Sequence, residues 1–133
     1  MLQRLETLLK AAADETRLRI LTLLRGNTLC VCQLVEVLGL PQSTISKHLV
    51  RLKLAGLVED EQRGKWAFYS LARSTAGDLH HGLVQLLTAS LRDDPRVDAD
   101  RSRVGHPRVE KLAACCPPRP AATRRRRPGG PRP

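Results

Sequence analysis

Two cysteines separated by one residue, Cys30 and Cys32, are the side chains of this 133-residue chain best suited to chemistry. Thiolate sulfur is a soft ligand, so a pair at this spacing predicts a site that prefers thiophilic ions to hard ones. On a regular helix, residues two apart point about 200° away from each other, so both sulfurs meet one ion only where the first turn is distorted. Ligand binding would then deform the element that carries the pair.

Other roles for cysteine are open at this point. Cys30 and Cys32 could be two small buried apolar side chains, a common use of cysteine in protein cores. A thiol enzyme is a third possibility, which the sequence argues against. It has no Cys-x-x-Cys beside a β-α-β pattern and no glycine-rich loop for an oxyanion. We therefore predict that the chain is not an enzyme and holds no catalytic cofactor.

The elements that position these residues follow from the spacing of apolar side chains. Helical periodicity predicts five helices, over residues 2–13, 15–25, 31–38, 42–54 and 75–91. Asp14 has the chemistry of an N-cap, and Gly26 and Gly39 that of helix ends. Between the last two helices, two extended runs flank a glycine-bearing turn, which predicts a β-hairpin. The fold is therefore mainly α with a β-hairpin wing.

The two short helices joined by residues 39–41 have the length and turn of a helix-turn-helix, whose second helix enters the major groove of DNA. Opposite its apolar stripe, this helix carries polar and basic side chains that can reach base edges and phosphates. The candidates on this helix are Gln42, Ser43, Thr44, Ser46, Lys47, His48 and Arg51. Arg63 and Lys65 at the hairpin tip are expected to contact phosphate, which makes the fold a winged helix-turn-helix. Periodicity alone also fits a helical interaction domain whose basic face is merely solvated.

Charge and composition limit the partners. The chain has 23 Lys and Arg against 13 Asp and Glu, a formal charge of +10, which indicates nucleic acid or an anionic membrane surface as partner. No apolar run approaches the roughly 20 residues of a membrane span, and the N-terminus lacks a secretion signal. We expect a cytoplasmic protein, with no membrane partner, whose thiols are reduced.

The C-terminal part differs in composition. Its final 17 residues contain six Pro and six Arg and little apolar area to bury. We predict a winged helix-turn-helix DNA-binding and dimerisation domain over residues 1–92. Residues 93–133 are expected to form a largely disordered basic tail that carries Cys115 and Cys116. The arginine run at 124–127 either adds nonspecific attraction to phosphate or is simply solvated.

Three segments, DETRLRIL, CVCQLVEVLGLPQSTISKHLVRLKLAGLV and RGKWAFYSL, follow one another at a characteristic spacing. Over residues 1 to about 91 the chain resembles the ArsR/SmtB family of metal-sensing bacterial repressors. The resemblance implies a homodimer built from the first helix and the 75–91 helix. Such a dimer binds a pseudo-palindromic operator in double-stranded DNA and represses transcription until an inducer binds. Two recognition helices about 34 to 36 Å apart reach successive major grooves, so a change in their separation weakens both contacts.

Within this family, the Cys-Val-Cys sequence resembles the arsenite and antimonite sensors, which implies As(III) or Sb(III) as inducer. The fullest pattern of those sensors has a third cysteine three residues after the second, where this chain has Val35. Cys115 or Cys116 could supply the third sulfur, because an extended tether of about 3.3 Å per residue from Leu91 spans more than the domain. Alternatively the tail cysteines are unused, and an exogenous thiol or water completes the site.

Two further hypotheses keep the fold. The cysteines could form an oxidative switch, in which a disulfide links the helix to the tail. The site could also sense another thiophilic metal, such as cadmium, lead or zinc, which prefers a fourth ligand. Asp78 and His80 make half of the zinc and cobalt pattern that the resemblance suggests, but Leu91 and Asp94 stand where further ligands are expected. His80 and His81 are therefore predicted to be exposed helix residues.

Overall fold

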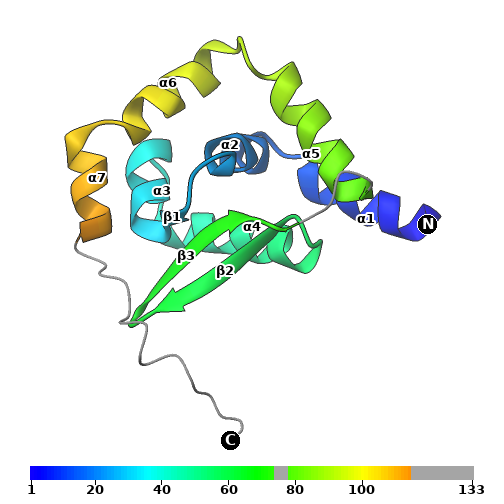
Figure 1. Cartoon of the computed structure of the whole chain (residues 1–133), viewed down its shortest axis with the longest axis horizontal. Helices are drawn as coiled ribbons and strands as arrows, with labels where there is room; N and C mark the ends of the chain where they lie inside the picture. The colour runs from blue at the N-terminus through cyan, green and yellow to red at the C-terminus, as the bar shows by residue number, and fades with distance from the viewer. Residues whose placement is uncertain (74–77, 115–133) are drawn as a thin grey trace, which may run out of the picture.

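The computed structural model describes residues 1–73 and 78–114. Its elements, in chain order, are α1 (Leu2–Ala12), α2 (Glu15–Leu24), β1 (Leu29–Cys30), α3 (Val31–Leu38), α4 (Gln42–Leu54), β2 (Val58–Arg63), β3 (Trp66–Leu71), α5 (Leu79–Ser90), α6 (Pro95–Val104) and α7 (Pro107–Ala114). The β2–β3 hairpin projects below α4, and α6 and α7 lie at the end of the molecule opposite α1 (Figure 1). Within the described residues, none of the helices is long and apolar enough to cross a membrane.

The helices expected over residues 1–91 are all present. The third and fourth span the predicted residues, and the others differ by a few residues at their ends. Asp14 caps α2, since its carboxylate accepts a hydrogen bond from the Arg17 backbone N–H at 3.1 Å. Gly39 ends α3 with a φ of 69°, a left-handed conformation that favours glycine. Local chain chemistry therefore sets these boundaries.

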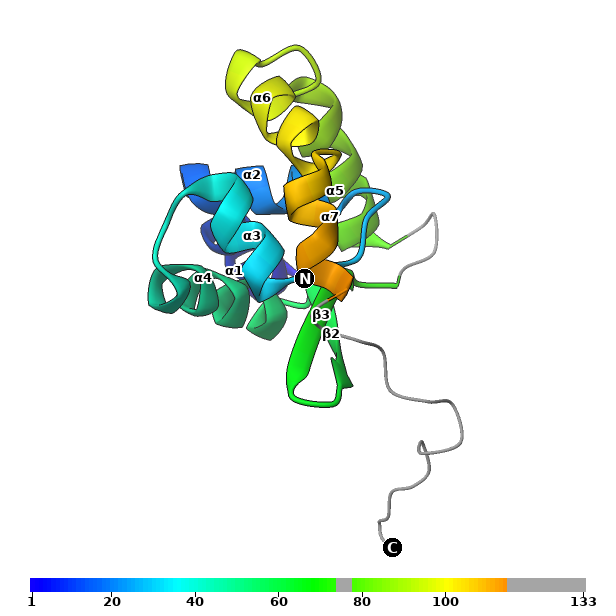
Figure 2. The same ribbon diagram turned by 90° about the vertical axis from the view of Figure 1, so that its left-hand side faces the viewer.

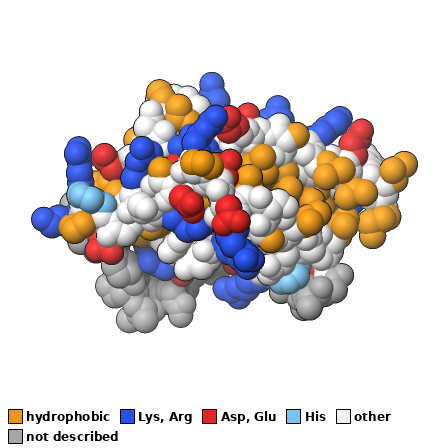
Figure 3. Space-filling model, turned by 90° about the horizontal axis from the view of Figure 1, so that it is seen from above, with side chains coloured by type: hydrophobic (Ala, Val, Ile, Leu, Met, Phe, Trp, Pro, Cys, Tyr) orange, Lys and Arg blue, Asp and Glu red, His pale blue; other side chains and the backbone are white. Residues whose placement is uncertain are grey.

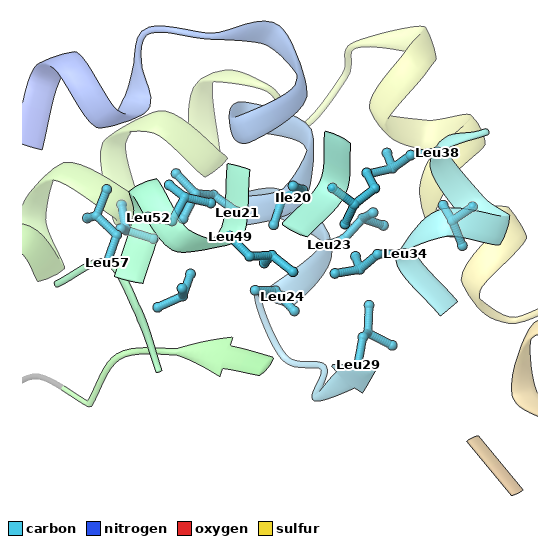
Figure 4. Close-up of a cluster of buried hydrophobic side chains, with 14 of the residues drawn as sticks. Ile20, Leu21, Leu23, Leu24, Leu29, Leu34, Leu38, Leu49, Leu52 and Leu57 are labelled. Atoms are coloured by element: carbon cyan, nitrogen blue, oxygen red, sulfur yellow. The ribbon is translucent and has the colours of Figure 1, made fainter. Parts of the chain in front are cut away.

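The core lies where α2, α3 and α4 meet. Its side chains are almost all leucine, isoleucine and valine, so the packing depends on branched aliphatic shape rather than on aromatic rings (Figure 4). Ile45, Leu49 and Leu52 form the buried stripe of α4, as the sequence predicts. Because this stripe faces α2, the opposite face of α4 is left to solvent.

A short strand that the sequence analysis did not predict completes the sheet. β1 pairs antiparallel with β3, in the strand order β1-β3-β2, with Leu29 opposite Tyr69 and Cys30 opposite Phe68. A strand of two residues is too short to give a periodic signal. Its pairing attaches the hairpin to the chain segment that leads directly into α3.

The C-terminal region corrects the expectation of a disordered 93–133 tail. Residues 95–104 and 107–114 form α6 and α7, and residues 115–133, with Cys115 and Cys116, lie outside the described part of the chain. Asp94 caps α6 through the Arg96 and Val97 N–H groups, and Pro95 occupies its first turn. Val97 and Val109 are buried. The Asp94-Pro95 pair therefore starts a helix within the segment expected to be disordered.

A buried ion pair fixes α6 on α2. Asp100 is 1% exposed, and its two carboxylate oxygens accept hydrogen bonds from Arg19 Nε and Nη2 at 2.8 and 2.9 Å. This paired geometry matches the planar guanidinium to the carboxylate. Arg103 adds a second attachment, since its Nη1 donates to the Val37 carbonyl at 3.1 Å. The domain therefore extends beyond residue 92, to the end of α7.

We predict that Asp100→Ala lowers the free energy of unfolding by about 3 kcal/mol, the low end for breaking a buried pair, because Arg19 keeps some contact with water. Urea denaturation measures the loss. Asp98→Ala is the matched control, since Asp98 is exposed on the same helix and its loss should cost within about 0.5 kcal/mol. Equal losses in the two variants would contradict the assigned role of the pair.

Candidate functional site

The two thiols meet without any distortion of α3. Cys30 ends β1 and is the N-cap of α3, with φ −84° and ψ 165°, while Cys32 lies in the first helical turn. Their Sγ atoms are 2.6 Å apart, beyond the roughly 2.05 Å of a disulfide. The expected unwinding is therefore not needed, because the extended backbone of Cys30 already turns its sulfur toward that of Cys32. Both sulfurs therefore lie at one point of the structure, with Cys30 buried and Cys32 half-buried.

The thiol pair also contacts the wing. Cys30 is 1% exposed and forms a small cluster with Phe68 of β3, against which the half-buried Cys32 packs. The guanidinium carbon of Arg63 lies 4.4 Å from the centre of the Phe68 ring, within cation–π range. Phe68 was not among the predicted site residues. The sequence shows that Phe68 and Trp66 lie on the same face of a strand. Because β1 was not predicted, however, nothing placed the Phe68 ring beside the cysteines.

Gln33 joins the thiol pair to the C-terminal helix. Its side chain is 5% exposed, and its Oε1 accepts the Cys30 backbone N–H at 3.0 Å, which forms half of a capping box. Its Nε2 donates to the Val109 carbonyl of α7 at 3.3 Å. One buried amide thus connects the start of α3 with α7. Sequence reasoning missed Gln33 because its second partner lies 76 residues away.

The donors available for a metal ion are few. Among residues 1–73 and 78–114, no group of three or more His, Cys, Asp or Glu side chains is arranged to hold a metal. Val35, which stands where the third cysteine is expected, packs against the core and has no side-chain donor atom. The described part of the chain therefore offers an ion two sulfur donors, from Cys30 and Cys32.

The helix-turn-helix consists of α3, the turn at residues 39–41 and α4. The outward face of α4 exposes Gln42, Ser43, Lys47 and Arg51, whereas Thr44 and Ser46 are half-buried. Amide, hydroxyl and cationic groups on one helix face can meet both base edges and phosphates. Of the seven residues on this helix predicted to contact DNA, four therefore face outward, two are half-buried, and the seventh is His48.

His48 is half-buried, unlike the four outward side chains of the predicted DNA-contacting set. Its Nδ1 lies 3.1 Å from Arg17 Nη1 and 3.8 Å from Asp14 Oδ2, so the ring faces the start of α2. Burial works to raise the pKa of Asp14, but the Arg17 backbone hydrogen bond and the charges of His48 and Arg17 outweigh it and lower that pKa. His48 therefore joins α4 to the start of α2, and its contact with DNA stays a prediction. The sequence carried one sign of this placement: His48 is three residues after the buried Ile45, so the two side chains lie on neighbouring parts of the helix surface.

The tip of the wing carries a solvated cation. Lys65 is exposed beside Gly64, and its neighbour Trp66 is 42% exposed. Arg63, which the sequence predicts to contact phosphate, pairs with Glu61 at 2.9 Å and covers Phe68. Its contact with phosphate stays a prediction.

The wing is also linked to the recognition helix. At the base of the hairpin, Lys53 of α4 contacts Asp60 of β2 at 2.8 Å. That hydrogen bond raises the pKa of Lys53. The pair therefore joins α4 directly to the wing, so a movement of either element can displace the other.

The Asp78-x-His80 segment lies at the start of α5. Asp78 is its N-cap, and His80 and His81 are half-buried rather than exposed as predicted. Both rings line a small hollow beside Arg25 and Thr88, and His80 Nδ1 lies 3.4 Å from Arg4 Nη2. This correction follows from packing of α5 against α2, which covers part of its first turn.

Large apolar side chains are exposed on α1 and α5. Leu2 is 84% and Leu86 65% exposed, and Leu9 is also exposed. Figure 3 shows hydrophobic side chains gathered at the end of the molecule that carries these two helices. Contiguous apolar surface on a small protein marks an interaction site. The surface lies at the two helices expected to form the dimer.

A helix-turn-helix with a polar, basic second helix, followed by a β-hairpin that extends its sheet, defines a winged helix-turn-helix protein. Residues 14–60 match the model of the family described as bacterial regulatory protein, arsR family. The chain is 42% identical, over 73 residues, to the arsenical resistance operon repressor of Bacillus subtilis, covering 53% of this chain and 69% of that one. The chain belongs to the arsR family of bacterial regulatory proteins.

Two other similarities support the assignment. The arsenic resistance transcriptional regulator ArsR1 of Pseudomonas putida is 44% identical over 63 residues, which cover 47% of this chain and 49% of that regulator. The chain thus matches about half the length of that relative. A homodimeric winged helix-turn-helix DNA-binding domain from Mycobacterium bovis, described as a possible ArsR-family transcriptional regulator, superposes with a TM-score of 0.57 at 27% identity. The superposed region covers 80% of this chain and 87% of the Mycobacterium bovis chain.

The placements of Arg51 and His48 predict two different variant phenotypes. Arg51→Ala should weaken DNA binding and lower the slope of log affinity against log salt by about 0.9 for each phosphate that the protein no longer neutralises. His48→Ala should leave that slope unchanged and lower the free energy of unfolding, because it removes the contact with α2. Salt-dependent binding to a labelled promoter duplex and urea denaturation measure the two effects. Arg92→Ala, exposed beyond α5, is the control; a reduced slope in His48→Ala would contradict the assignment.

Proposed function

We propose that the chain is a transcriptional repressor that binds operator DNA as a homodimer in the cytoplasm and is released when As(III) or Sb(III) binds Cys30 and Cys32. One observation carries the proposal: the paired sulfurs lie at the junction of the helix-turn-helix and the wing. The names of the arsenical resistance relatives support the choice of inducer. Under this proposal the protein performs no catalysis.

Operator binding uses the outward face of α4 and the tip of the wing. Gln42, Ser43 and the half-buried Thr44 and Ser46 supply hydrogen-bonding groups near the start of the helix, where base edges are reached. Lys47, Arg51 and Lys65 supply phosphate contacts, which position the helix and make binding depend on salt. His48 and Arg63 act indirectly, by holding α4 and the wing.

Dimerisation places two such helices on one side of the duplex. The exposed apolar residues of α1 and α5 form the surface that a second copy would cover, and the similar domain from Mycobacterium bovis is homodimeric. Half-sites one helical turn apart require the recognition helices about 34 to 36 Å from each other. A small rotation of α3 and α4 within each subunit therefore weakens both contacts together.

Inducer binding acts where local structure is tightly defined. Cys30 caps α3, pairs with β3 and touches Phe68, so a trivalent ion that inserts between its sulfur and that of Cys32 moves the Cys30 side chain and strains both elements. The ring of Phe68 carries that change to Arg63, and the cap carries it to α3. Metal–sulfur bonding supplies the free energy. A coupling of about 1 to 3 kcal/mol lowers DNA affinity about 5- to 150-fold.

Serine variants test the inducer site. Cys30→Ser and Cys32→Ser should bind the promoter duplex as the wild type does, because neither side chain faces DNA. Arsenite should lower the affinity of the wild type about 5- to 150-fold and that of each variant less than about twofold. Fluorescence anisotropy of the duplex measures both quantities. Serine variants that release DNA at the same arsenite concentration as the wild type would exclude this site.

A second candidate inducer is an oxidant. The 2.6 Å separation of the two sulfurs favours a direct Cys30–Cys32 disulfide more than the link to the tail that the sequence suggested. In that reaction one hydrogen peroxide oxidises the two thiols to one disulfide, and two waters leave. The disulfide would displace the Cys30 sulfur from its cap, and DNA would be released through the same elements.

Peroxide distinguishes the two inducers. If arsenite is the inducer, peroxide alone should leave the DNA complex intact at concentrations that do not oxidise free glutathione. Arsenite should release the DNA even when a reductant keeps all thiols reduced. Mass spectrometry counts disulfides in the released protein. Release that requires peroxide and fails with arsenite in the presence of reductant would establish the redox switch instead.

A further inference from the structure

Arg17 is a buried cation that joins three helices. It lies on α2 and is 8% exposed, and each of its three side-chain nitrogens has a partner on another helix. Nε and Nη2 donate to the backbone carbonyls of Ala11 and Lys10, the second at 3.3 Å, and Nη1 lies 3.1 Å from Nδ1 of His48 on α4. One guanidinium therefore contacts both the end of α1 and the recognition helix.

The end of α1 suits a buried cation. α1 ends at Ala12, so the carbonyls of its last turn have no partner within the helix, and they form the negative end of the helix dipole. Lys10 and Ala11 supply two of these carbonyls to Arg17. The charge-assisted hydrogen bonds offset the cost of removing the guanidinium from water. The position of Arg17 is therefore tied to the C-terminal turn of α1.

The contact between Arg17 and His48 has one possible direction. Every guanidinium nitrogen is a donor and none can accept, so Nδ1 of His48 accepts the hydrogen bond from Arg17. His48 is held there with only 19% of its side chain exposed. An acceptor at the position of Nδ1 is therefore what α4 must supply to this link.

The same helices otherwise meet through apolar side chains. Leu8 and Ala11 of α1 belong to the core that also holds Ile45 and Leu49 of α4. Figure 2 shows α1 behind α3, between α2 and α4. Apolar contact is nondirectional, whereas a hydrogen bond weakens steeply when its angle changes. The contacts of Arg17 therefore restrict the angle between α1 and α4 more sharply than the core does.

Under the proposed function, α1 and α4 have different partners. α1 carries Leu2 and Leu9, which are exposed on the surface proposed for the second copy, and α4 carries the outward side chains proposed to contact DNA. The angle between the two helices within each subunit therefore sets where the two recognition helices of the dimer lie. Because symmetry relates the subunits, an angular change in one is repeated in the other.

We propose that Arg17 is a positioning residue for operator binding, which holds α4 at a fixed angle to α1 and thereby selects the spacing between half-sites that the dimer accepts. The inference rests on the proposed homodimeric repressor and assigns its choice of half-site spacing to one link. One base pair changes the separation of two half-sites by about 3.4 Å and their relative rotation by about 35°. A dimer with firmly held recognition helices therefore accepts a narrow range of spacings, whereas one with loosely held helices accepts several.

Duplexes that carry the same two half-sites at different spacings test the assignment. Footprinting of the wild type on its promoter defines the half-sites, and one or two base pairs are then inserted or deleted between them. Fluorescence anisotropy with the full-length protein should show affinity about tenfold lower at two base pairs from the preferred spacing, because one recognition helix loses its base contacts. Arg17→Lys should reduce this preference to less than about threefold, because one ammonium cannot replace the planar fork of donors. An unchanged preference in Arg17→Lys would overturn the proposal.

Two substitutions of His48 separate positioning from contact with DNA. Asparagine can place its carbonyl oxygen near the position of Nδ1 and accept from Arg17, whereas leucine offers no acceptor. His48→Asn should keep the spacing preference of the wild type, and His48→Leu should lose it as Arg17→Lys does. The double variant Arg17→Lys/His48→Leu should lose no more than either single variant, since both remove one link. If His48→Asn and His48→Leu show the same preference, the link through His48 is excluded and the proposal fails.

Two controls separate positioning from a general loss of stability. Arg25→Lys makes the same substitution at the exposed C-cap of α2 and should keep the wild-type preference. Asp100→Ala, destabilised through α6, should also keep it at temperatures where circular dichroism shows a folded protein. A preference lost in Asp100→Ala as well would overturn the special role of Arg17. A wild type that binds one half-site as tightly as the whole operator would instead contradict the proposed dimeric repressor itself.

Discussion

The arrangement of the sheet and the helix-turn-helix depends on Cys30, which belongs to both. Cys30 is the last residue of β1, paired with the wing strand, and the N-cap of the first helix of the helix-turn-helix. The backbone cannot change at this point without altering either the sheet or the helix start. A second thiol two residues later lies in contact with the first. Under the proposed mechanism, an ion bound by these sulfurs would act on both α3 and the wing.

The surrounding side chains stiffen this junction. Phe68 closes one side under the guanidinium of Arg63, and Gln33 satisfies the cap from the other side while it binds α7. His48 performs the same task at the far end of the unit, where it joins α4 to the start of α2. Rigid connections of this kind transmit small movements because packed interiors do not deform continuously. Several polar and basic side chains near the DNA face therefore serve structure first.

Sequence patterns predicted most of this fold. Apolar spacing placed the five helices, Asp14 and Gly39 placed two boundaries, and turn chemistry placed the hairpin. The cysteine pair was visible from its spacing alone. The patterns could not show partners distant in sequence, such as Gln33 with Val109, nor a two-residue strand with no period. They also failed at the proline that follows Asp94, because an Asp-Pro pair that ends one helical pattern can equally start the next helix.

Trp66, the single tryptophan of the chain, stands at the hairpin tip with its ring partly open to solvent. Indole emission responds to the polarity around the ring and is quenched by stacked bases. The molecule therefore carries an intrinsic fluorescent reporter on the wing, the element proposed to approach DNA. The emission wavelength and lifetime of Trp66 report on the surroundings of the hairpin tip without any attached dye.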